Sequence, residues 1–245
     1  MIFQGAAERV HHRRGPFRIW RSYPGRHVSD DTGLGPIGAI DHAELLPGLL
    51  VPMHEHRDDE IVSYLREGEM THVDSAGRRE IISARRLMVM NAGTGFSHEE
   101  SIPPDGAPVR MLQIFLRPHD TGLSPGVQFA PLEPSVSDGR WRLVAGPADE
   151  GACASVRSDV LVYDAALEPR ASLDVPAREG YGWWLYVMRG SLTVGGHPLG
   201  PGDSLACVEG DTRRIEGHEA SDLALFAFSR NARFTDRGSL SGRRL

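Results

Sequence analysis

The chain contains no lysine, because all 27 of its basic residues are arginine. Enzymes that form a Schiff base with a substrate or with pyridoxal phosphate need a lysine amine, and a Walker-type phosphate-binding loop needs a lysine next to its glycines. The absence of lysine therefore excludes these chemistries.

Cysteine and long apolar runs are scarce. Cys153 and Cys207 lie outside any C-x-x-C pattern, which argues against a disulfide framework or a thiolate zinc site. We expect both to be buried as small apolar side chains. The longest apolar runs, such as 183–188, are too short to span a bilayer, and the first residues lack the apolar core of a signal peptide. We therefore expect a cytoplasmic protein without membrane contact.

Positive charge is also in deficit, since 33 acidic residues against 27 basic ones give a net charge of −6. Binding to duplex nucleic acid depends on neutralising phosphates, so direct nucleic-acid binding is not expected. Arginines do cluster at 9–26 and 230–244, and we interpret these stretches as solvated edges and a frayed C-terminus.

Short β-prone apolar runs bounded by turn residues recur along the chain, whereas long helical periodicity is scarce. The 28 glycines and 17 prolines supply the positive or fixed φ angles that many tight turns need. We therefore predict an all-β fold. The predicted core strands are 61–65, 87–90, 111–116, 160–163, 183–188 and 223–228.

The two halves of the chain repeat the same order of parts, which indicates an internal duplication. In each half a strand ending at a glycine, Gly68 or Gly190, is followed by a hairpin, a short turn and two further strands. Prolines crowd the stretch between the halves. The predicted parts are an N-terminal domain at 1–120, a linker at 121–140, a C-terminal domain at 141–232 and a basic tail at 233–245.

The densest group of metal-ligand residue types is His54-Glu55-His56, followed later by His98-Glu99-Glu100. Side chains alternate between the faces of a strand, so His54 and His56 share one face, as do His98 and Glu100. Two such strands in one barrel would direct three imidazoles and a carboxylate to a common point. Burying four polar groups without a shared partner is costly. The pattern therefore predicts metal binding by these four residues.

Imidazole and carboxylate ligands suit iron, zinc, manganese, nickel or copper, and suit calcium or magnesium poorly. Four protein ligands leave coordination positions open, which is typical of a catalytic site. Glu60 competes with Glu100 for the carboxylate position, and its alternative is a surface carboxylate at a strand edge. The remaining histidines lack this pairing, and we interpret them as surface or turn residues: His11, His12, His27, His42, His72, His119, His197 and His218.

These motifs resemble the cupin superfamily, and within it the pirin family. Gly48, His54-x-His56, Glu60 and Gly68 look like the first cupin motif, with one extra residue before the last glycine. Further stretches similar to pirins are 1–9, 54–68, 72–77, 90–98 and 112–114. The resemblance implies a bicupin, with two jelly-roll-like β-barrels and one metal in the N-terminal barrel. It favours Glu100 over Glu60, and we expect iron ahead of zinc, manganese, nickel and copper.

In the second half the positions aligned with the ligands fall near Pro176, Arg178 and Glu216. No imidazole pair is present there, so we expect no metal in the second barrel. The sequence also departs from the family pattern, because 83–85 reads Ser-Ala-Arg where a Pro-Gly-Asp turn is usual, and because the segment 33–42 is altered. The first change concerns a turn rather than a ligand.

The resemblance also implies an activity, since bacterial pirin-like proteins are associated with quercetin 2,3-dioxygenase activity and the nuclear member with iron-dependent modulation of transcription factors. For a dioxygenase, Glu100 is the natural base for the 3-hydroxyl proton of a flavonol. Phe96, Met53 and Gln113 are candidate pocket neighbours. The alternatives are a metal-containing regulatory module that binds a protein partner, and a zinc-dependent hydrolase or isomerase.

Overall fold

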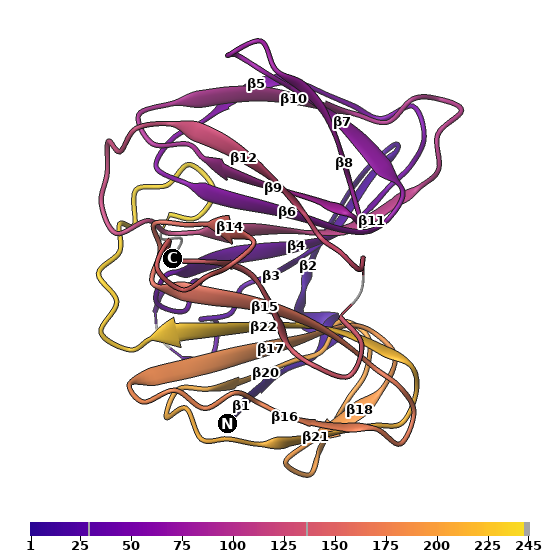
Figure 1. Ribbon diagram of the computed structural model, residues 1–245, viewed down its shortest axis with the longest axis vertical. Coiled ribbons are helices and arrows are strands. Elements are labelled where there is room, and N and C mark those ends of the chain that lie inside the picture. Colours follow the sequence, from indigo (N-terminus) through magenta and orange to yellow (C-terminus); the bar gives the residue numbers. More distant parts are fainter. Residues whose placement is uncertain (29, 136, 243–245) are drawn as a thin grey trace.

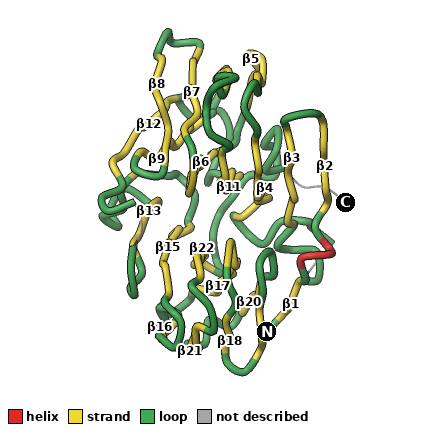
Figure 2. The backbone as a smooth tube through the Cα atoms, turned by 90° about the vertical axis from the view of Figure 1, so that its right-hand side faces the viewer, coloured by secondary structure: helices red, strands yellow, loops and turns green. Residues whose placement is uncertain are grey.

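The chain folds into two stacked β-barrels (Figure 1). The computed structural model describes residues 1–28, 30–135 and 137–242. Figure 2 shows that strands dominate the described backbone, with one short 3-10 turn, η1 (Ala6–Glu8). The all-β, two-barrel fold predicted from the sequence is therefore confirmed.

An eleven-stranded sheet curls into the N-terminal barrel. Its strands are β2 (Val10–Arg14), β3 (Phe17–Ser22), β4 (Ile37–Leu45), β5 (Leu50–His56), β6 (Glu60–Glu67), β7 (Glu69–Asp74), β8 (Arg79–Ser83), β9 (Arg86–Asn91), β10 (Phe96–Ser101), β11 (Val109–Leu116) and β12 (Gly126–Pro131). Neighbouring strands follow the order β2-β3-β4-β11-β6-β9-β8-β7-β10-β5, and β12 pairs with β9.

A seven-stranded and a four-stranded sheet form the C-terminal barrel. The larger sheet contains β1 (Ile2–Gln4), β13 (Arg142–Gly146), β14 (Ala154–Ser155), β15 (Val160–Leu167), β17 (Tyr181–Arg189), β20 (Ser204–Cys207) and β22 (Ser221–Ser229). The smaller sheet contains β16 (Ser172–Asp174), β18 (Leu192–Val194), β19 (His197–Leu199) and β21 (Arg214–Gly217). Their orders are β1-β20-β17-β22-β15-β13-β14 and β16-β21-β18-β19.

The internal repeat appears in the pairing of the strands. The N-terminal barrel contains the run β4-β11-β6-β9, and the C-terminal barrel contains the run β15-β22-β17-β20. Both runs are antiparallel throughout, and their members correspond in chain order. The six predicted core strands all lie within observed strands.

The central strands are buried on both faces, which explains their unbroken apolar runs. On β17, Trp183 points into the core of the C-terminal barrel, whereas Trp184 and Tyr186 point into the contact between the barrels. Tyr64 of β6 and Ile114 of β11 enter the same contact from the other side. One apolar cluster thus joins two barrels that each have a core of their own.

Three segments pack on barrels to which the predicted domain bounds do not assign them. Strand β12 falls in the predicted linker 121–140 and pairs with β9 of the N-terminal barrel. Strand β1 falls in the predicted N-terminal domain and pairs with β20 of the C-terminal barrel. Near the C-terminus, residues 235–242 return to the N-terminal barrel along the yellow trace in Figure 1.

The interpretation of the tail as frayed is therefore wrong for residues 235–242, which hydrogen-bond to the N-terminal barrel. Arg243 and Arg244 of the predicted basic tail lie outside the described residues. The cysteine prediction is right for Cys207, which packs in the C-terminal core, and wrong for Cys153, which is exposed. Cys153 stands in a loop before β14, and loops run over the surface because their backbone polar groups need water.

Candidate metal centre

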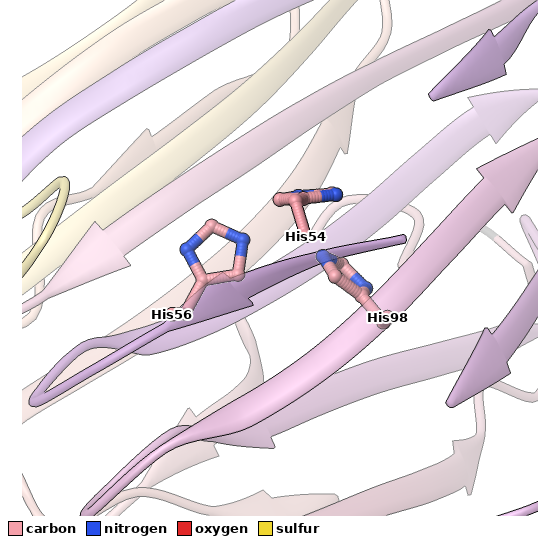
Figure 3. A group of neighbouring side chains, drawn as sticks. All are labelled: His54, His56 and His98. Carbon is pink, nitrogen blue, oxygen red and sulfur yellow. The ribbon is translucent and has the colours of Figure 1, made fainter. Parts of the chain in front are cut away.

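Three imidazoles meet inside the N-terminal barrel (Figure 3). His54 and His56 come from β5, and His98 comes from β10. The two strands are antiparallel neighbours, in a register that sets His98 opposite His54. One ligand atom from each ring lies within 4.8 Å of the others. The period-2 spacing in the sequence thus brings the three rings to one place.

Glu100 lies beside this group of imidazoles. An extra residue in β5 shifts the pairing with β10 from His98 opposite His54 to Glu100 opposite Val51. The Glu100 side chain is buried, lines the same pocket as His54 and His56, and places Oε1 4.0 Å from Nδ1 of His98. The four predicted ligands therefore occupy one region, with the carboxylate next to the three rings.

Burial favours the neutral form of these groups. Burial and the neighbouring imidazoles lower the pKa of His98 to about 2, and burial lowers the pKa of His54. Burial raises the pKa of Glu100 to about 7, against the opposing effect of a hydrogen bond with Gln113. A metal ion binds the neutral imidazole, so the rings are already in the form that ligates.

Several buried polar atoms of the site have no hydrogen-bond partner within the part of the chain that the structure describes. They are both ring nitrogens of His56, Nε2 of His98 and Oε1 of Glu100. Each unsatisfied buried group costs roughly 1–3 kcal/mol. A divalent first-row ion accepts an electron pair from one nitrogen of each imidazole and from a carboxylate oxygen. The residues present therefore fit a metal ion.

Two groups that the sequence pattern did not indicate flank the imidazoles. His72 was interpreted as a surface or turn residue, which is wrong, because it is fully buried on β7 with Nδ1 3.3 Å from Nδ1 of His98. Asp59 is also buried, and its Oδ2 lies 3.7 Å from Nδ1 of His56. Groups behind a ligating imidazole fix its orientation. His72 and Asp74 stand two residues apart, as His54 and His56 do, and this spacing is the pattern in the sequence that indicates a shared strand face.

Glu60, the competing carboxylate, lies away from the imidazoles. It is fully buried and accepts hydrogen bonds of 2.7 Å from the backbone N of Arg157 and from Oγ of Ser158, and one of 2.6 Å from Nδ2 of Asn91. These contacts tie β6 to the C-terminal barrel. The interpretation of Glu60 as a surface carboxylate is therefore wrong.

A pocket of about 620 Å³ opens beside the imidazoles. Pockets for small molecules typically measure about 300–1,000 Å³. Arg21 and Asp41 form a bidentate ion pair in the wall, with both distances 2.6 Å. The apolar part of the lining comes from Phe17, Ile19, Val51, Phe115 and Leu240.

Of the predicted pocket neighbours, Gln113 lines the pocket. Phe96 packs in the core of the N-terminal barrel, and Met53 is exposed on the far face of β5. The alternation that places His54 inward turns Met53 outward, so its exposure follows from the same rule.

Comparisons with known proteins match both halves of the chain. Residues 8–116 match the family described as Pirin, and residues 143–227 match the Quercetinase C-terminal cupin domain. The Zymomonas mobilis protein ZMO1337 is 30% identical over 213 residues, which cover 86% of this chain and 81% of that protein. The chain belongs to the pirin family of cupins.

Two further proteins resemble this pirin over nearly its whole length. The quercetin 2,3-dioxygenase of Escherichia coli K12 is 27% identical over 224 residues, 90% of this chain and 95% of its own. The crystal structure of the Escherichia coli pirin YhhW in complex with nickel(II) superimposes with a TM-score of 0.81 at 24% identity, covering 93% of this chain and 98% of its own. The structural match shows a shared fold. The pirin resemblance noted in the sequence is thus confirmed.

In the C-terminal barrel of this pirin, the positions aligned with the ligands have other partners. Arg178 pairs with Glu150 at 2.6 Å, and Glu216 is exposed near Arg214. That this barrel holds no metal remains a prediction. Among the described residues no helix is long and apolar enough to cross a membrane, and the cytoplasmic location also remains a prediction.

Proposed function

We propose that this pirin is a metal-dependent dioxygenase that acts on a flavonol such as quercetin. The observation that carries the proposal is a group of three imidazoles and a carboxylate beside a pocket of about 620 Å³, with buried atoms that have no partner among the described residues. The relative from Escherichia coli is named a quercetin 2,3-dioxygenase, which supports the same reaction. We propose iron as the resident metal, although the related YhhW structure contains nickel(II).

His54, His56, His98 and Glu100 would hold the ion. A bound first-row cation supplies Lewis acidity toward the oxygens of the flavonol and a path for electrons to dioxygen. Glu100 lines the pocket, and its Oε1 has no partner among the described residues. With one carboxylate oxygen on the ion, the other oxygen of Glu100 would take the proton of the flavonol 3-hydroxyl as a general base.

The walls bind and orient the flavonol. Phe17, Ile19 and Phe115 provide apolar surface for its planar rings. The Arg21 guanidinium lies 5.5 Å from the centre of the Phe115 ring and is fixed by Asp41, so this part of the wall is rigid. Gln113 is hydrogen-bonded to Glu100, which holds the carboxylate toward the pocket.

The test uses protein loaded with iron(II) and follows flavonol absorbance with and without dioxygen. We expect oxygen-dependent loss of the absorbance, abolished in His54→Ala and in Glu100→Ala because each removes a ligand. Glu55→Ala is the matched control, since Glu55 lies on the same strand with an exposed side chain paired to Arg57. Metal-loaded wild-type protein that is inert toward a panel of flavonols would contradict the proposal and favour a regulatory metal protein.

The choice of carboxylate has its own test in metal content. We expect Glu100→Ala to lose metal and Glu60→Ala to keep it, because Glu60 is bonded to Arg157 and Ser158. The reverse result would show that the assignment of Glu100 is wrong.

A further inference from the structure

The segment 235–242 crosses from the C-terminal barrel to the wall of the pocket. We propose that this segment contributes to the metal site and its pocket. Asp59 both positions His56 and anchors the segment, and Leu240 limits the size of the ligand that enters the pocket. The part concerning Leu240 rests on the proposed function. The part concerning Asp59 is independent of it, because it concerns metal binding.

The anchor is one buried carboxylate with several donors. Oδ1 of Asp59 accepts hydrogen bonds from the backbone N of Ser241 at 2.8 Å and from its Oγ at 2.6 Å. Oδ2 accepts hydrogen bonds from the backbone N of Leu240 at 2.9 Å and from Oγ of Ser239. Asp59 is fully buried, so loss of this acceptor leaves several donors of the segment unpaired away from water.

The surrounding barrel is shaped to receive the segment. Arg117 is fully buried, and its Nε donates to the carbonyl of Ser241 at 2.7 Å. A Cβ atom on Gly38 of β4 would lie 2.6 Å from Cα of Ser241, and one on Gly238 would lie 2.3 Å from Oδ1 of Asp59. Glycine stands on both sides of the contact, which allows this close approach.

The same carboxylate reaches the metal site. Oδ2 of Asp59 lies 3.7 Å from Nδ1 of His56, which is within electrostatic range but longer than a hydrogen bond. The same carboxylate therefore faces a ligand ring and holds the returning segment. Leu240, held by its backbone N–H on Asp59, lines the pocket together with His54 and His56. A carboxylate behind a ligating histidine fixes the ring, and its loss typically costs about 10–100-fold in metal affinity. Asp59 is therefore a positioning residue.

The first experiment measures anaerobic binding of iron(II) and of nickel(II) to Asp59→Asn by calorimetry, with circular dichroism to confirm folding. We expect affinity to fall by about 10–100-fold. Asp58→Asn is the matched control, because Asp58 is the neighbouring residue and its Oδ1 accepts a hydrogen bond from Gly122 at 2.7 Å. A folded Asp59→Asn protein with wild-type metal affinity overturns the positioning role.

Should Asp59→Asn fail to fold, Ser241→Ala replaces it. Ser241→Ala keeps the Asp59 carboxylate and removes one of its hydrogen-bond donors. It therefore loosens the segment with a smaller loss of stability than Asp59→Asn. We expect weaker metal binding in this variant and faster proteolysis of the segment 235–242. Unchanged metal affinity combined with faster proteolysis would show that the segment is a structural appendage only.

The second experiment measures anaerobic binding of quercetin to metal-loaded Leu240→Trp and Leu240→Ala. The larger tryptophan side chain would fill part of the pocket. We therefore expect the affinity for quercetin to fall roughly tenfold or more, with metal affinity unchanged. Leu240→Ala enlarges the pocket and should improve binding of a bulkier 7-O-substituted flavonol relative to quercetin. Binding unaltered in both variants overturns the role of Leu240, whereas a wild-type protein that binds no flavonol contradicts the proposed function instead.

Discussion

His42 is held without charge in the contact between the barrels. Its Nδ1 lies 3.0 Å from Oη of Tyr186, which also accepts a hydrogen bond from Arg9 at 2.8 Å. Burial, and then the positive charges of Arg9 and Arg110, lower the pKa of His42 to about 4. The interpretation of His42 as a surface or turn residue is wrong, because strand β4 carries it into this contact.

His42 therefore makes stability depend on pH. The unfolded chain binds a proton at His42 near pH 6.5, whereas the folded protein binds it only near pH 4. Unfolding takes up a proton between these values, so the folded state loses stability as pH falls from 6.5 toward 4. In His42→Gln we expect this loss to be smaller, by at most about 3 kcal/mol. Urea unfolding of the metal-free wild-type and His42→Gln proteins between pH 6.5 and pH 4 measures this difference. Free energies of unfolding that change in parallel with pH in the two proteins would contradict the prediction.

The sequence indicates which side chains share a strand face, but not which strands become neighbours. Alternation identified His54, His56 and His98, because it is a local property of β5 and β10. Asp59 and Leu240 are separated by 181 residues, and their contact depends on the return of the C-terminal segment. No local pattern predicts such a contact.

Strand β1 protects an edge of the C-terminal sheet. Its three residues pair with β20, opposite Ala206, Leu205 and Ser204, and β20 has no other partner on that side among the described strands. The backbone N of Ala6 also donates a hydrogen bond of 2.8 Å to Oδ1 of Asp203. An uncovered edge offers unpaired N–H and C=O groups to other chains.

Deletion of residues 1–4 should therefore lower the melting temperature and increase aggregation on heating, which calorimetry and light scattering would measure. Phe3→Thr is the control, since the Phe3 side chain is 47% exposed and the strand keeps its backbone pairing. Equal aggregation of the deletion and the wild-type protein would show that β1 gives no protection.

The elements that the sequence predicted are those buried on both sides. Strands β17 and β22 contain unbroken apolar runs, and β6 one interrupted only by Ser63, because one face packs in a barrel core and the other in the contact between barrels. Strands β1 and β12 are short or half-exposed, and pairing with β20 and β9 is what makes them strands. Tertiary contacts decide such segments.

The contact between the barrels combines an apolar cluster with buried polar links. Trp184 and Phe226 pack at its centre, with ring centroids 5.4 Å apart. Across the contact, Oη of Tyr64 donates to Asp164 at 2.7 Å. A large apolar interface makes independent motion of two domains unfavourable. We therefore expect the barrels to unfold together.

Trp184→Ala should lower the free energy of unfolding by roughly 3–5 kcal/mol, since it leaves a cavity at this contact. Circular dichroism and nickel(II) release should report the same urea midpoint, because metal in one barrel is lost when the other unfolds. Trp141→Ala is the control, since Trp141 lies at the edge of the C-terminal core. Separate midpoints for the two signals in the wild-type protein would show that the barrels are independent.

The return of Ser239, Leu240 and Ser241 to Asp59 also fixes when the pocket is completed during translation. The ribosome makes His54, His56, His98 and Glu100 well before these residues, with β13 to β22 of the C-terminal barrel in between. A nascent chain can thus hold all four ligand residues while Leu240, the last residue of the pocket wall, is still missing. The complete pocket wall forms only after both barrels have been synthesised.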